Sequence, residues 1–156
     1  MALAGVVSLG MSAVYDKARQ SFISQSPSID LDTDTIKVFL LDAASYTPNL
    51  ATDQFLSDVP AAARKGNAGG STRADAPTLG SKTVTAGVLD AADVVITAIP
   101  AGAALEYILI FKDDGVADAS SPLVALIDTA TGLPITPNGA DVTIVWDPGA
   151  NRIFKV

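Results

Sequence analysis

The residues of this chain that could most readily take part in catalysis are its aspartates. The sequence has no histidine and no cysteine, so a histidine base, a thiolate nucleophile and a cysteine-ligated zinc are excluded. The possibilities that remain for catalysis are paired carboxylates, lysine chemistry and metal sites whose ligands are all oxygen atoms. Glu106 is the only glutamate, and nothing in the sequence places a second carboxylate beside it. We therefore predict no enzyme activity and no cofactor.

Alternating aspartates at the start of a strand resemble the beginning of a calcium loop. Asp30, Asp32 and Asp34 have the spacing of the first three ligands of an EF-hand. That loop also needs glycine at its sixth position and glutamate at its twelfth, where this chain has Thr35 and Leu41. The spacing therefore favours solvent-facing aspartates, and a weak calcium site of another kind is left open.

Two further motifs are interpreted as ordinary loops. Asp113 and Asp114, with Asp118, form an acidic turn typical of a β-hairpin. The run 80–83, Gly-Ser-Lys-Thr, lacks the glycine directly before lysine and the upstream glycine of a phosphate-binding loop. Neither motif predicts a site.

The aromatic side chains raise the alternative of a carbohydrate- or receptor-binding module. Trp146, Tyr15, Tyr46 and Tyr107 would form a stacking platform if they were exposed together. Trp146, however, lies on the apolar side of an alternating segment, which favours a place in the core.

Charge argues against a nucleic acid partner, and the N-terminal segment does not predict a membrane span. The net charge is -7 and charged residues make up only 17% of the 156 residues, whereas phosphate backbones require clustered cations. Arg64 and Lys65, with Arg73 nearby, form the only basic group, and we interpret it as a solvated loop. The apolar segment 1–10 is too short to cross a bilayer and lacks the basic start of a signal peptide.

These residues must be positioned by a mainly β chain. One helix is predicted at 12–24, with Ser12 as its N-cap and Val14, Ala18, Phe22 and Ile23 on its apolar face. Short apolar segments separated by turn residues then predict an antiparallel β-sandwich or barrel of about seven strands. The strands are expected at 35–41, 82–85, 93–98, 105–111, 123–127, 141–147 and 152–156, with a short edge segment within 132–139.

The predicted domain organisation is an N-terminal arm, residues 1–11, followed by a single domain, residues 12–156. A long irregular segment spans 42–81. Its glycine-rich part, 66–72, has few side chains that can pack, so we expect it at the surface or ordered only by a neighbouring chain.

Several segments resemble short virion proteins of tailed bacteriophages. The resemblance lies in 128–147 with 151–155, in 34–42, and in Tyr46-Thr-Pro with 55–60. It implies a structural protein of the virion, made in the host cytoplasm: a capsid decoration (cement) protein, or alternatively a tail, baseplate or fibre component. Decoration proteins of this kind are β-rich, often trimeric, and bind neighbouring subunits of the major capsid protein.

The low charge and the apolar arm agree with a subunit that is completed by its neighbours. We expect a homo-oligomer, with a trimer favoured, whose partners are the major capsid protein or other virion proteins. The residues expected at interfaces are Leu3, Val6, Val7, Leu9, Met11, Tyr46, Phe55, Arg64, Lys65 and Arg73.

Overall fold

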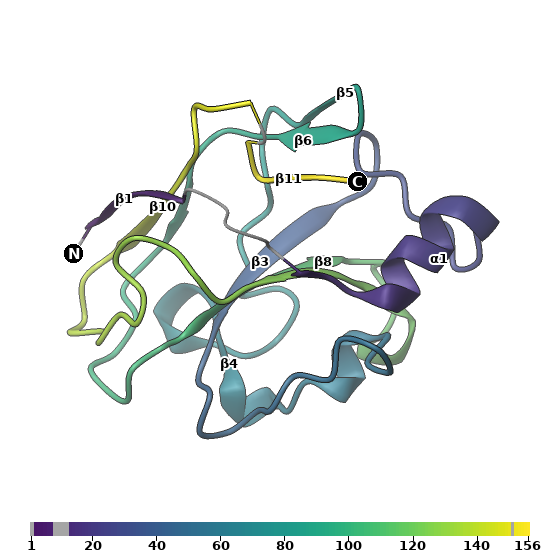
Figure 1. The fold of residues 1–156 in the computed structure, drawn as a ribbon. Coiled ribbons are helices and arrows are strands. Elements are labelled where there is room, and N and C mark those ends of the chain that lie inside the picture. Colours follow the sequence, from purple (N-terminus) through teal and green to yellow (C-terminus); the bar gives the residue numbers. More distant parts are fainter. Residues whose placement is uncertain (1, 8–12, 151) are drawn as a thin grey trace.

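The computed structural model describes residues 2–7, 13–150 and 152–156 (Figure 1). One α-helix and eleven strands are described, together with four short 3-10 helices. The strands are β1 Ala2–Val7, β2 Ala13–Val14, β3 Ile36–Leu41, β4 Arg64–Lys65, β5 Thr83–Thr85, β6 Val88–Asp90, β7 Val94–Ile96, β8 Tyr107–Lys112, β9 Leu123–Ile127, β10 Val142–Trp146 and β11 Phe154–Lys155. The helices are α1 Asp16–Ser24, η1 Leu56–Asp58, η2 Ala61–Ala63, η3 Asn67–Gly69 and η4 Asp118–Ser120.

A five-stranded antiparallel sheet, in the order β2-β9-β8-β3-β4, forms the centre of the fold. Its two long strands, β3 and β8, are paired along their whole length, with Val38 opposite Ile110. Both were predicted to be apolar on two faces, and their central residues are buried. The rings of Phe39 and Phe111 stack with centroids 5.5 Å apart. Burial on both faces makes this pair the main support for the loops that leave its ends.

Two smaller sheets pack with the central one. The first has the order β1-β10-β7, with β1 parallel to β10 and β7 antiparallel to it. The second has the order β11-β6-β5, and Figure 1 shows it above the central sheet. Leu89 and Phe154 are buried from this second sheet. Together the sheets enclose one hydrophobic cluster.

The predicted mainly β fold class is confirmed, and the sheets are not closed into a barrel. Each of the seven predicted strands is present: β9 has the predicted bounds, β8 begins later and ends one residue beyond its predicted end, and the other five are shorter. The prediction omitted β1, β2, β4 and β6. Except for β1, these strands have only two or three residues, too few for an alternating pattern to stand out.

The helix prediction is wrong at its N-terminal end. Helix α1 begins at Asp16, and Tyr15 occupies the N-cap position without a side-chain cap. Val14 belongs instead to β2, which pairs with β9, and Tyr15 N donates to Val124 O. Pairing with β9 therefore satisfies the backbone that the prediction assigned to the first helical turn. The predicted cap, Ser12, lies outside the described residues.

The apolar face of α1 also differs from the prediction. Ala18 and Ser21 are buried and Phe22 is half-buried, whereas the side chain of Ile23 is 88% exposed. The helix thus covers only a small part of the core and leaves a large apolar side chain in solvent.

Part of the predicted arm forms β1. Residues 2–7 pair with β10 of the same chain, in a register that sets Leu3 opposite Ile144 and Val7 opposite Trp146. Leu9 and Met11 lie outside the described residues. Contact of this segment with a second chain stays a prediction.

The glycine-rich segment is ordered by its own chain, contrary to one part of the prediction. Asn67 N donates to Asp75 O at 2.8 Å, and Ala68 N donates to Thr97 O at 2.7 Å. Glycine is needed at Gly66 because a Cβ atom there would lie 2.5 Å from Asp75 O. The segment therefore folds against residues 75 and 97 without help from a neighbour.

Candidate functional site

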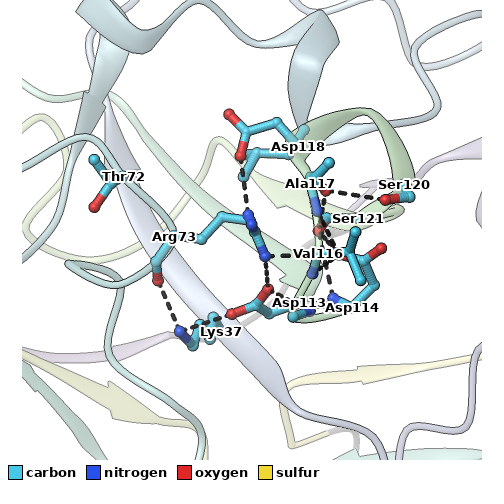
Figure 2. Close-up of polar contacts among 12 residues, drawn as sticks. Lys37, Thr72, Arg73, Asp113, Asp114, Val116, Ala117, Asp118, Ser120 and Ser121 are labelled. Carbon is cyan, nitrogen blue, oxygen red and sulfur yellow. Dashed lines mark hydrogen bonds and ion pairs between the residues drawn. The ribbon is translucent and has the colours of Figure 1, made fainter.

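Five charged side chains from four parts of the chain converge beside the end of β8. We call this group the clasp: Lys37, Arg64, Arg73, Asp113 and Asp118. Arg73 is its centre, with Nη1 2.5 Å from Asp113 Oδ1 and Nε 3.1 Å from Asp118 Oδ1 (Figure 2). Lys37 Nζ lies 2.8 Å from Asp113 Oδ2, and Arg64 Nη1 lies 2.6 Å from Asp118 Oδ2. The clasp joins the segment around residue 73 to the β8–β9 loop.

Each basic member of the clasp is placed by a different element. Lys37 projects from β3, and its Nζ also donates to Arg73 O at 2.7 Å. Arg64 stands at the start of β4, where its backbone pairs with Leu41 of β3. Because β3 and β8 are adjacent, the aspartate that follows β8 is brought to the lysine on β3.

Arg64 is buried rather than solvated, which corrects the prediction of a solvent-facing basic loop. Its side chain is only 4% exposed. Nη2 donates to Leu56 O at 2.7 Å, and Nε donates to Val59 O at 2.9 Å. The guanidinium therefore binds backbone carbonyls of η1 and the residue after it, as well as a carboxylate. Arginine suits this role because its planar group presents five donors.

Two aspartates that follow β8, Asp113 of the clasp and its neighbour Asp114, have lowered pKa values. Burial alone would raise the pKa of Asp113, but hydrogen bonds from Lys37, the Gly115 backbone and Arg73 together hold the pKa below its ordinary value. The pKa of Asp114 is held low by hydrogen bonds, first from Ser120 and then from backbone and side-chain donors of the same loop. These carboxylates are stabilised as anions, which is the opposite of what a general acid requires.

A cleft of about 520 Å³ opens at the clasp, lined in part by Ser71, Thr72 and Ala74. The side chains of Lys37 and Asp113 are close enough to be joined by an amide cross-link. Formation of that bond, however, needs a neutral amine and a protonated carboxylic acid. Arg73 stabilises the ionised carboxylate instead. The geometry therefore favours a persistent ion pair that fastens two loops together.

The aspartates of the calcium-like motif make local turns. Asp30 Oδ1 accepts from Asp32 N at 3.1 Å, and Asp34 Oδ2 accepts from Asp30 N at 2.7 Å. Lys112 Nζ lies 2.8 Å from Asp34 Oδ2. Among residues 2–7, 13–150 and 152–156, no group of three or more potential ligands is placed to hold a metal ion.

The aromatic residues do not form an exposed platform. Trp146 is buried, as predicted, and its Nε1 donates to Ala92 O at 3.1 Å. Tyr15 and Tyr46 are also buried, and Tyr46 Oη donates to Asp53 Oδ2 at 2.7 Å. Tyr107 is half-buried. This arrangement counts against the carbohydrate-binding alternative.

The predicted interface residues occupy unlike environments. Tyr46 and Arg64 are buried, so they present little surface to a partner. Phe55 is half-buried, and its backbone forms a bridge with Pro122. Lys65 is half-buried and its Nζ donates to Ala62 O at 2.8 Å. The structure brings Arg64 and Arg73 together in the clasp and leaves the interface role of all ten residues a prediction.

An apolar groove lies between α1 and the C-terminal strand. It has a volume of about 490 Å³ and is lined by Val14, Arg19, Phe22, Ile23, Lys155 and Val156. Ile23 and Val156 are among the most exposed large apolar side chains of the described chain, at 88% and 60%. Sequence analysis missed this surface because it placed Ile23 on the inner face of the helix.

Comparisons with protein-family models, curated proteins and solved structures find no match. In the part of the chain that the structure describes, no helix has the length and apolar character needed to cross a bilayer.

The clasp is the feature that sequence reasoning missed most completely. Its acidic half was interpreted as an ordinary hairpin and its basic half as a solvated loop. The available signal was the presence of basic and acidic residues on segments that flank the adjacent strands β3 and β8. Nothing in sequence spacing shows that residues 73 and 113 meet, because the contact depends on how the 42–81 segment folds back.

Proposed function

We propose that this protein is a non-enzymatic structural subunit of a tailed-phage virion. Within that class, we propose a decoration protein that binds the outside of the major capsid lattice. The resemblance of its sequence to phage virion proteins supports the class. The observation that carries the proposal is a group of three adjoining loops without charged residues, which we call the uncharged end.

This uncharged end is formed by three loops that hydrogen-bond to one another. Ala68 N donates to Thr97 O at 2.7 Å, and Gly139 N donates to Ile99 O at 2.8 Å. A hollow of about 220 Å³ beside Pro100 is lined by these loops together with Asp42, Lys65 and Leu105. The loops comprise residues 66–70, 97–104 and 137–140, which include no charged residue in a chain of net charge -7.

The composition of the uncharged end fits protein contact. Ala98, Pro100, Ala101 and Ala103 are exposed there. Interface centres are depleted of charged residues relative to the rest of a protein surface. Several weak contacts made by one subunit or oligomer add up on a lattice, because its first contact raises the effective concentration of its other contacts.

The clasp supports the non-enzymatic part of the proposal. Its two carboxylates are paired with internal cations, and its arginines are occupied by loop carbonyls and aspartates. Such groups stabilise a shape and are not poised to transfer protons.

Binding to particles tests the proposal. Purified protein is mixed with capsids of the phage whose genome encodes it, prepared without this protein, and sedimented. We expect saturable co-sedimentation of the wild type. An Ala101→Asp substitution places a charge in the uncharged end, so binding should weaken at least tenfold.

The matched control is Ala51→Asp, which adds the same charge at an exposed alanine outside the uncharged end. It should bind as the wild type does. Failure of the wild type to bind capsids would reject the decoration role, and binding to isolated tails instead would favour the tail-associated alternative. Equal weakening by both variants would reject the uncharged end as the contact surface.

A further inference from the structure

The 137–140 loop of the uncharged end contains a pair of residues that can react with each other. Asn138 is the only asparagine of the chain that is followed by glycine. In such a pair the backbone nitrogen of the glycine can attack the side-chain amide carbon of the asparagine, because glycine has no Cβ atom to hinder the approach. Asn138 and Gly139 are both exposed, so water reaches them.

The reaction of this pair is deamidation, and it proceeds in two steps. A base in solution removes the proton from Gly139 N, which forms a bond to Cγ of Asn138 while the Cγ–Nδ2 bond breaks. Nδ2 takes up a proton and leaves as ammonia, and a five-membered succinimide ring remains. Water then opens the ring at either carbonyl carbon, which yields aspartate or isoaspartate. The product carboxylate is ionised at neutral pH, whereas the original amide is uncharged.

The fold directs the attacking nitrogen away from its target. Gly139 N donates to Ile99 O at 2.8 Å. When the proton leaves, the lone pair of the nitrogen lies where the N–H bond was, so it points at Ile99 O instead of Cγ of Asn138. Ile99 is fixed in turn, because its side chain is buried and its own N donates to Ala140 O at 3.3 Å. The attack therefore requires the 137–140 and 97–104 loops to separate.

The side chain of Asn138 is restrained as well. Its Oδ1 accepts from Ala140 N at 3.1 Å, a local bond that is typical of asparagine in turns. Ala98 N donates to Asp141 Oδ1 at 2.8 Å, which ties the residue after the 137–140 loop to the 97–104 loop. Hydrogen bonds thus restrain both reacting groups.

We infer that Asn138 is a latent deamidation site, which the hydrogen bonds between the two loops keep unreactive in the folded protein. Local opening of the loops releases Gly139 N, so the rate of deamidation follows the fraction of molecules in which the loops are open. The reaction places a carboxylate in a surface whose loops contain no charged residue. Because the ammonia is lost to the solvent, closure of the loops does not reverse the change.

Peptide mass spectrometry after incubation in mildly alkaline buffer tests this inference. Wild-type protein is incubated folded and in concentrated urea, sampled over time, and digested with pepsin in acid. The peptides then show how much of the Asn138 amide has become a carboxylate. We expect the reaction to be at least tenfold slower in the folded protein, because only the open state reacts. Asn67, which is followed by alanine, should change slowly in both samples.

An Asp141→Ala variant tests whether the loop contacts give this protection. The substitution removes the acceptor of Ala98 N and leaves the Asn-Gly pair unchanged. Asn138 should therefore react at least threefold faster than in the folded wild type. The matched control is Asp147→Ala, because Asp147 also accepts a backbone N–H, that of Gly149 at 2.8 Å, but lies outside both loops. The control should react at the wild-type rate.

Two results would overturn the inference. The first is a folded wild type that deamidates at Asn138 as fast as the unfolded chain does. The second is an Asp141→Ala variant that is folded by circular dichroism and reacts no faster than the wild type. The comparison in urea depends on neither variant, and none of these measurements uses capsids, so their outcome is independent of the proposed function.

Discussion

Arg64 and Asp118 form an ion pair of 2.6 Å in which the arginine is almost completely buried and the aspartate is 38% exposed. The pair joins β4 to the β8–β9 loop, across 54 residues of sequence. Because the guanidinium is buried, breaking this pair should cost more than breaking an exposed ion pair.

Replacement of Arg64 by methionine should destabilise the fold strongly. The substitution leaves Val59 O without its guanidinium donors, whereas Leu56 O keeps the bond from Val59 N. An unsatisfied buried group costs about 1–3 kcal/mol. We expect a loss of roughly 3 kcal/mol in the free energy of unfolding, measured by urea denaturation. The control, Asp16→Asn, breaks the Arg19–Asp16 pair, in which both side chains are about 60% exposed, and should cost about 1 kcal/mol or less. Equal losses would contradict the buried role of Arg64.

Acid should weaken the clasp. The folded-state pKa of Asp113 lies below its ordinary value of about 3.9, so the carboxylate contributes stability above that pH. This stability is lost as the pH falls through the lower folded-state pKa. The wild type should therefore lose stability steadily below about pH 4. Asp113→Asn should be less stable at pH 7 and show a flatter decline in acid, and an unchanged decline would contradict the assignment.

The buried tyrosine pair should resist ionisation. Burial raises the pKa of Tyr15, and burial together with the hydrogen bond to Asp53 raises the pKa of Tyr46. A raised folded-state pKa contributes stability that is present below about pH 10 and is lost as the pH rises above it. Absorbance of tyrosinate should therefore show these two phenols ionising only as the protein unfolds. Their ionisation in a folded protein would contradict the buried network.

Glycine 70 should not tolerate a side chain. An added Cβ atom there would overlap the carboxylate of Asp75, which accepts from Thr72 N at 2.9 Å. Gly70→Ala should cost about 1–3 kcal/mol as the glycine-rich segment is displaced. Gly80→Ala is the control because no atom lies within 4 Å of the added Cβ, and it should be neutral or stabilising. A thermal melt of both variants distinguishes these results.

The parts of the fold that sequence predicted are those with a long local pattern. Strands β3 and β8 have six residues each with apolar side chains on both faces, and β10 alternates between buried and half-buried positions. Residues 13–15 were mistaken for helix because their side chains fit a helical face, whereas hydrogen bonds to β9 decide their conformation. That choice depends on a strand more than 100 residues later.

The candidate site was harder to predict for the same reason. The roles of Lys37 and Arg73 depend on the return of the 42–81 segment along β3, where Val38 N donates to Pro77 O. Basic residues in a glycine-rich context resemble a solvated loop until that path is known. The exposure of Ile23 likewise depends on how α1 is rotated over β9.

The most direct test of the proposed structural role is the abundance of this protein in purified particles. Quantitative mass spectrometry of virions from the encoding phage should find it in a fixed ratio to the major capsid protein. Electron microscopy should place its copies on the outer capsid surface. The account would be contradicted if purified particles contained none of this protein although the infected cells produced it at its normal level.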